Sequence, residues 1–188
     1  MKHVLIIVSL LTIFIIQNSC NSQSNTKKVA LQQCRTLGDE SILYARANYV
    51  KLFNTINPEK FNSSYQKVKD FDYIRHRNMI NTYDIAVQKL KPNDSVSKAL
   101  LKSCKGLAKF SKELVDQAYP SAISFKEKSK LDPLTDDFFL EINKLVKFDH
   151  TIGKYEKGFI SFKQHVSAYE VAVNNYISKF KSELSEEN

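Results

Sequence analysis

The sequence has 188 residues, of which 43% are hydrophobic and 26% are charged, and its formal net charge is +8 at pH 7. This much apolar content is enough for a sizeable core, so the composition excludes a chain that is disordered throughout. Only 4 Gly and 4 Pro occur and no internal repeat is present, which leaves few places for the chain to turn. Few turns between long periodic segments predict helices within a single domain.

The first 19 residues have the layout of an export signal. Lys2 supplies a positive start, and the 13 residues from Val4 to Ile16 are apolar except for Ser9 and Thr12. A helix that crosses a bilayer needs about 20 apolar residues, and this run ends at once in polar Gln17. We therefore expect residues 1–19 to be a signal peptide that is removed from the mature chain.

Cys20 comes soon after this run and directly after the small residue Ser19, in the stretch "IIQNSC". The segment resembles the signal of bacterial lipoproteins, in which a cysteine receives a diacylglycerol and the chain is cut before it. The resemblance covers residues 1–20 and departs from the usual pattern at Gln17, where an aliphatic residue is common. It implies lipidation of Cys20 and attachment to a bacterial membrane, on the periplasmic side or at the surface of the cell envelope. The alternative is an ordinary secretory signal cut nearby, which leaves Cys20 as a thiol.

The residues after Cys20 are small and polar. The stretch "NSQSNTKK" predicts a flexible tether, so we assign residues 20–28 to the lipidated cysteine and its tether. Residues 29–185 are then the folded helical domain. Several acyl chains on one cysteine would hold this domain firmly at the membrane.

Apolar residues recur at steps of three and four in four long segments. The third segment is expected to bend at Pro120, and the fourth to slip in register at Gly153. The expected segments cover about residues 26–56, 58–90 with Pro58 in the first turn, 95–130 capped by Asp94, and 132–180. Short connections make neighbouring helices antiparallel, so we predict an all-α, up-down-up-down four-helix bundle with long helices.

Two cysteines lie at matching heights in this arrangement. Cys34 and Cys104 face inward on the first and third segments, and their heights differ by only about 5 Å at 1.5 Å per residue. In an oxidising compartment they would form a disulfide, and lipidation of Cys20 leaves exactly these two thiols to pair. The alternative is two buried free thiols that pack as small hydrophobic groups.

A row of lysines follows the third segment on the side opposite its apolar face. Its members are spaced by four, three, four and three residues: Lys98, Lys102, Lys105, Lys109 and Lys112. Such a row suits anionic lipid headgroups, an anionic envelope polymer or an acidic protein partner, and otherwise it is simply a solvated face. Nucleic acid is not expected, because no binding motif accompanies the charge.

Asp72 and His76 lie four residues apart on the predicted inner face of the second segment. Asp72 is expected to be level with Asp149 of the fourth segment, which has His150 beside it. We favour a hydrogen-bonded polar layer, assisted by Arg75 or Ser41, over a metal site, since Glu-x-x-His motifs are missing. Haem is disfavoured too. The sequence has no Cys-x-x-Cys-His motif, although His76, Met79, His150 and His165 are residues of the axial-ligand type. No cofactor is therefore expected.

The sequence contains no nucleophile elbow, phosphate-binding loop or dinucleotide motif. We therefore expect a non-catalytic binding, assembly, inhibitor or immunity module that is lipid-anchored in the cell envelope. The alternative is a metal- or haem-binding bundle with a redox or storage role. The sequence identifies neither the partner nor the oligomeric state.

Overall fold

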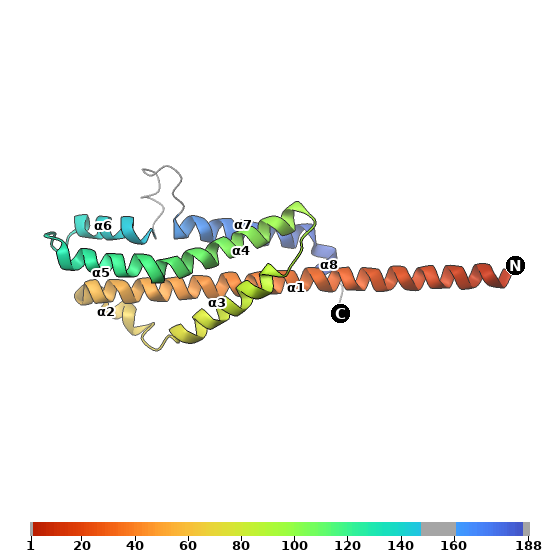
Figure 1. Cartoon of the computed structure of the whole chain (residues 1–188), viewed down its shortest axis with the longest axis horizontal. Helices are drawn as coiled ribbons and strands as arrows, with labels where there is room; N and C mark the ends of the chain where they lie inside the picture. Colours follow the sequence, from red (N-terminus) through yellow and green to blue (C-terminus); the bar gives the residue numbers. More distant parts are fainter. Residues whose placement is uncertain (1, 148–160, 186–188) are drawn as a thin grey trace.

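The computed structural model describes residues 2–147 and 161–185, with side chains described from Asn25 onward. This part of the chain is all-helical and contains no strand, which confirms the expected all-α class. The elements are α1 (Lys2–Ile56), α2 (Pro58–Gln66), α3 (Tyr73–Gln88), α4 (Ser95–Glu113), the π-helix η1 (Leu114–Ala118), α5 (Tyr119–Lys128), α6 (Asp136–Val146), α7 (Phe162–Lys179) and α8 (Lys181–Ser185) (Figure 1). In this described part, no helix combines the length and the apolar character needed to cross a bilayer.

α1 is the helix on which the others assemble, and it contacts α2, α3, α4, α7 and α8 (Figure 1). The most extensive contacts between helices are those of α4 with α7, α1 with α3, and α1 with α4. One contiguous apolar core results, and its fully buried members include Leu37, Leu100, Leu107, Ile142 and Tyr176. The packed part of α1 reaches back to Lys27, whose ammonium group pairs with Asp94.

Aromatic rings close the core at the end of α1 that is far from Lys27. The ring of Phe53 lies 5.1 Å from that of Phe61 in α2 and 5.5 Å from that of Phe139 in α6. The amide of Asn57 donates to the carbonyl of Pro133 at 3.2 Å, while its side-chain oxygen caps α2. The α5–α6 connection is thus held to the α1–α2 corner.

The second segment is two helices rather than one, which corrects the expectation for residues 58–90. α2 begins at Pro58 as predicted but ends at Gln66, and α3 begins only at Tyr73. Asp72 stands just outside α3, where its carboxylate accepts from the amide of Arg75 at 2.9 Å. The amides in the first turn of a helix need acceptors, which a preceding helical turn or a capping side chain can supply. Because the Asp72 carboxylate supplies one here, α3 begins as a separate helix.

The third segment is distorted at the expected place. Asp94 caps α4 by accepting from the amides of Val96 and Ser97. The π-helix η1 then separates α4 from α5 and ends just before Pro120. Proline has no amide hydrogen and its ring clashes with the carbonyl four residues earlier, which here belongs to Asp116. A wider π turn over these residues relieves that clash.

The fourth segment is described as α6 and α7. α6 ends at Val146, and the next residue, Lys147, has a positive φ of 53°. α7 opens with a capping box in which Ser161 and Gln164 exchange hydrogen bonds. The register slip expected at Gly153 lies outside the described residues.

α1 is in close contact with α7 at Gly38. A Cβ atom placed there would lie 2.2 Å from Cζ of Tyr169. That ring is buried, and its hydroxyl lies 3.2 Å from the carbonyl oxygen of Arg35 and 3.0 Å from a carboxylate oxygen of Asp39. Burial and the neighbouring Asp39 charge raise the pKa of the Tyr169 phenol, so the ring stays neutral and in place.

We expect Gly38→Ala to destabilise the protein because the added methyl group would displace the Tyr169 ring. Overpacking of this kind costs about 1–3 kcal/mol. The matched control is Gly106→Ala, because a Cβ atom at Gly106 would meet its nearest neighbour, the His165 ring, at an ordinary 3.6 Å. Replacing a helical glycine with alanine there should stabilise the protein by up to about 1 kcal/mol. Urea unfolding followed by circular dichroism measures both; equal stability of the two variants would contradict the close contact.

Candidate binding site

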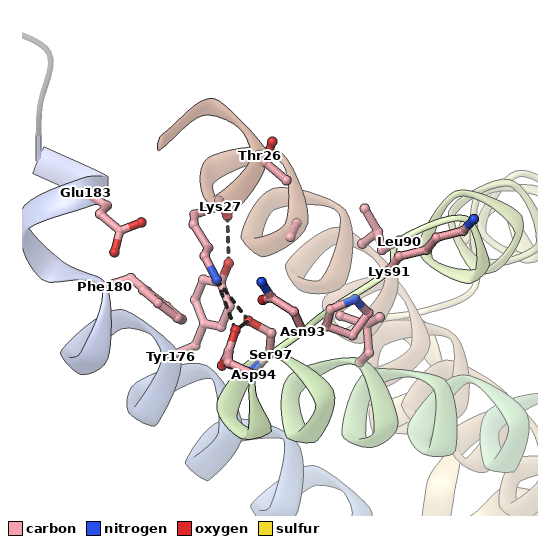
Figure 2. A pocket seen from close by; sticks show the side chains of 13 residues that line it. Thr26, Lys27, Leu90, Lys91, Asn93, Asp94, Ser97, Tyr176, Phe180 and Glu183 are labelled. Carbon is pink, nitrogen blue, oxygen red and sulfur yellow. Dashed lines mark hydrogen bonds and ion pairs between the residues drawn. The ribbon is translucent and has the colours of Figure 1, made fainter. Parts of the chain in front are cut away.

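A cavity of about 380 Å³ lies at the end of the helices where α3 leads into α4 and where α8 meets α1 (Figure 2). It has the size of a small-molecule site. Its wall is made by Thr26, Lys27, Ala30, Leu90, Lys91, Pro92, Asn93, Asp94, Ser97, Leu101, Tyr176, Phe180 and Glu183. Four separate parts of the chain therefore meet around it: the start of the packed part of α1, the α3–α4 connection, the first turns of α4, and the α7–α8 junction.

A lysine–aspartate pair forms the centre of the cavity wall (Figure 2). Nζ of Lys27 lies 3.0 Å from Oδ2 of Asp94, and the hydroxyl of Ser97 donates to the same oxygen at 2.6 Å. The ammonium group of Lys179 approaches the other oxygen, Oδ1, at 3.5 Å. One carboxylate thus faces two ammonium groups while it also caps α4.

These contacts fix the charge of Asp94. Burial alone would raise its pKa, but the hydrogen bonds from Ser97 and Lys27 and the charge of Lys27 outweigh burial. The pKa is held well below its ordinary value. Asp94 is therefore a permanent anion at neutral pH and does not serve as a proton donor.

Two aromatic side chains from the C-terminal helices complete the wall. Tyr176 is fully buried, and its hydroxyl donates to the backbone carbonyl of Lys27 at 3.1 Å. Burial raises the pKa of Tyr176 to about 12, so it remains protonated. The ammonium group of Lys27 also lies 3.8 Å from the ring centre of Phe180, within the range of a cation–π contact.

Lys91 and Asn93 line the cavity and carry hydrogen-bond donors. Both are exposed, and neither makes a hydrogen bond or ion pair with any residue in the described ranges. Asn93 lies near Lys27, whereas the Lys91 side chain extends away from the Lys27–Asp94 pair and adds positive charge at the edge of the cavity (Figure 2). The arrangement is suited to holding an anionic group by charge and hydrogen bonding.

The sequence predicts the capping role of Asp94 but does not predict that these residues form a site. Asp94 was expected as a helix cap, which the structure confirms, whereas Lys27 was assigned to the tether of residues 20–28. A polar segment gives no sign that its lysine will pair with a residue 67 positions away. Tyr176 and Phe180 lie in the fourth predicted segment, and both are buried.

The lysine row lies along α4 opposite its buried face. Lys98, Lys102, Lys105 and Lys109 are exposed, while Lys112 is partly buried. Two members have partners: Lys112 pairs with Asp84 of α3 at 3.0 Å, and Lys109 lies 3.6 Å from Glu113. No ion pair joins Lys98, Lys102 or Lys105 to another residue of the described chain.

The two inner cysteines are brought together, on α1 and α4. Cys34 and Cys104 are fully buried and free in this structure. A hydrogen bond with the thiol of Cys104 raises the pKa of Cys34, and burial raises it further. Cys104 donates to the carbonyl of Leu101 at 3.3 Å. The expected matching heights of the two cysteines thus agree with their contact in the core.

Asp72 and His76 do not take the positions expected of them in the polar layer. Asp72 is an exposed helix cap rather than an inward-facing residue, because the helix that was to carry it breaks there. His76 instead places Nδ1 2.5 Å from Oε2 of Glu40 in α1 and stacks on the ring of Phe71. Asp149 and His150 lie outside the described residues. Neither proposed helper takes part, since Ser41 donates to its own helix at Leu37 and Arg75 is exposed.

The remaining residues of ligand type are separated. His165 is half-buried against the ring of Phe110, and burial lowers its pKa although Glu113 opposes that shift. Met79 lines a shallow groove on the outer side of α3. Within residues 2–147 and 161–185, no three His, Cys, Asp or Glu side chains are grouped closely enough to hold a metal ion.

The side chain of Cys20 lies outside the residues whose side chains are described, so its lipidation stays a prediction. Comparison of the chain with protein-family models, with curated proteins and with solved structures gave no match.

Proposed function

We propose that this protein is a lipid-anchored helical module of the bacterial cell envelope, which binds an anionic partner and has no catalytic role. Assembly, inhibitor and immunity functions all fall within this class. The observation that carries the proposal is the exposed part of the lysine row on α4, Lys98, Lys102 and Lys105, for which the described chain supplies no counter-charge.

The setting of this row supports a binding role. The opposite face of α4 is anchored in the core through Leu100, Cys104 and Leu107, so the lysines are presented on a rigid helix. From Lys98 to Lys105 the row covers about 10 Å of helix axis at 1.5 Å per residue. Like charges at these spacings repel by a few tenths of a kcal/mol per pair, and an anionic partner relieves that repulsion.

An up-down-up-down arrangement of four helical segments is the architecture we propose for the module. It is supported by the order of the helix pairs, since α1 packs on α3 and on α4, and α4 packs on α7. The short connections between α1 and α2 and between α3 and α4 also favour antiparallel neighbours.

The lysine row is tested with dextran sulfate as an anionic probe and the full mature protein. We expect the triple variant Lys98→Gln, Lys102→Gln and Lys105→Gln to weaken binding roughly tenfold, because three exposed charge contacts are lost. The wild-type affinity should also fall as salt is added, and that dependence should be shallower in the variant.

The matched control removes the same charge elsewhere, at Lys69, Lys128 and Lys130, which are exposed and lie outside α4. Binding by this control should stay close to that of the wild type. If both triple variants lose the same affinity, net charge rather than the row accounts for binding, and the proposal is wrong.

The membrane anchor is tested at Cys20. We expect Cys20→Ala to move the protein out of the membrane-bound, acylated pool. Mass spectrometry of the wild type should find the mature chain beginning at Cys20 with its lipid attached. An unacylated wild-type amino terminus would refute the anchor.

We also propose that Cys34 and Cys104 are joined by a disulfide in the exported protein, supported by their contact in the core. The two thiols would give up two protons and two electrons to a disulfide-bearing oxidant, which is reduced to a dithiol. Because both thiols are buried, this exchange should precede the final packing of α1 on α4. The link would stabilise the fold by about 2–4 kcal/mol.

A thiol-labelling count checks this link. Protein isolated from the envelope and unfolded without reductant should show no label at Cys34 or Cys104, and both should label after reduction. Labelling of the two cysteines before reduction would show that they stay free.

A further inference from the structure

The cavity lies at the end of the domain that is closest in sequence to Cys20. Six residue steps separate Cys20 from Thr26, and even a fully extended chain of this length spans only about 22 Å. Thr26 and Lys27 are themselves part of the cavity wall. The opposite end of the domain is far away, since α1 runs on for about 44 Å between Lys27 and Ile56. If Cys20 carries lipid, the cavity is the part of the domain that faces the headgroups.

This end of the domain also carries an excess of positive charge. Its three stretches, residues 25–31, 88–94 and 176–185, contain six lysines and two acidic residues, Asp94 and Glu183. The sequence adds Glu186 and Glu187, which lie outside the described residues, and the lysines still outnumber the acids. A surface of this kind is attracted to an anionic leaflet over distances of about a Debye length.

The cavity provides the specific contacts for an anionic headgroup. Lys27 of the cavity wall and the neighbouring Lys179 share the carboxylate of Asp94, and Glu183 is the second carboxylate of the wall. With Lys91, the lysines at the cavity outnumber its two acidic residues by one. Lys91 and Asn93 add an ammonium group and an amide whose hydrogen bonds the described chain does not use. Leu90 and Pro92 from the α3–α4 connection and Phe180 from the α7–α8 junction add apolar surface to the cavity wall, which suits the glycerol and the first acyl carbons of a phospholipid.

We infer that this cavity binds the headgroup of an anionic phospholipid in the same membrane that holds the lipid anchor. The inference rests on the proposed anchor and deepens it. The acyl chains hold the protein at the bilayer, and the cavity sets which end of the domain lies against the headgroups. Two attachments of this kind restrict the orientation of the domain, which a single flexible point of attachment does not.

The test compares lysine reactivity on vesicles. The full mature protein is reconstituted into phosphatidylcholine vesicles and into vesicles in which about one third of the lipid is phosphatidylglycerol. We expect acetylation of Lys91 and Lys179 to slow several-fold when phosphatidylglycerol is present. Lys128 and Lys130, at the opposite end of the domain, should react equally on both vesicles.

A double variant, Lys91→Gln with Asn93→Ser, isolates the cavity from the anchor. Both side chains are exposed, so the variant should fold, as circular dichroism will confirm. It should remain attached to both kinds of vesicle but lose the phosphatidylglycerol-dependent protection of Lys179. The control variant Lys128→Gln should keep that protection.

Flotation of the same samples separates the two hypotheses. Protein that floats with phosphatidylcholine vesicles has its anchor, so equal reactivity of Lys91 on both vesicles would then overturn the cavity inference alone. Protein that carries no lipid and does not float would overturn the anchor, and the inference with it. If inorganic phosphate without vesicles protects Lys91 and Lys179 as well as phosphatidylglycerol does, the ligand is soluble phosphate and the lipid inference is wrong.

Discussion

Small side chains along one face of α1 are the constraint on which the packing depends. Cys34, Gly38, Ser41, Ala45 and Asn48 recur at steps of four and three, and all are buried. They let neighbouring helices approach the α1 backbone itself. The hydroxyl of Ser111 in α4 donates to the carbonyl of Ser41 at 2.9 Å. The same face accommodates the Tyr169 ring of α7 at Gly38, so α4 and α7 both pack against small residues of α1.

α3 is held by polar pairs as well as by apolar contacts. Only Ile80 and Val87 are buried along it. Three pairs attach it to its neighbours: His76 with Glu40 of α1, Arg77 with Asp116 of η1 through two parallel contacts, and Asp84 with Lys112 of α4. Partly exposed pairs of this kind each contribute little, and salt weakens them. The attachment of α3 is therefore partly sensitive to salt.

The parts of this structure that the sequence predicts are those set by local chemistry. Helical periodicity, the cap at Asp94, the start of α2 at Pro58 and the distortion near Pro120 are all readable within a few residues of where they act. The contact of Cys34 with Cys104 follows from helix rise alone, once the order of the helices is assumed. Each of these depends on one helix or on a simple alignment of two.

The features that the sequence does not predict depend on the rotation of a helix about its axis and on which acceptor a donor group bonds to. The break before α3 arises because Asp72 bonds to the Arg75 amide, a choice that periodicity does not reveal. His76 meets Glu40 instead of a partner on its own helix, because the rotation of α3 about its axis is set by contacts distant in sequence. Lys27 looks like part of a linker, and only its pairing with Asp94 shows that it belongs to the fold.

The hydrogen bond from Tyr176 to the carbonyl of Lys27 joins the start of the packed part of α1 to the last turn of α7. A mechanical pull on the chain ahead of Lys27, directed along α1, would therefore load that helix in shear against α4 and α7. Shear must break many side-chain contacts together, whereas peeling breaks them one after another. The geometry thus favours a domain that resists extraction when force is applied through its amino terminus.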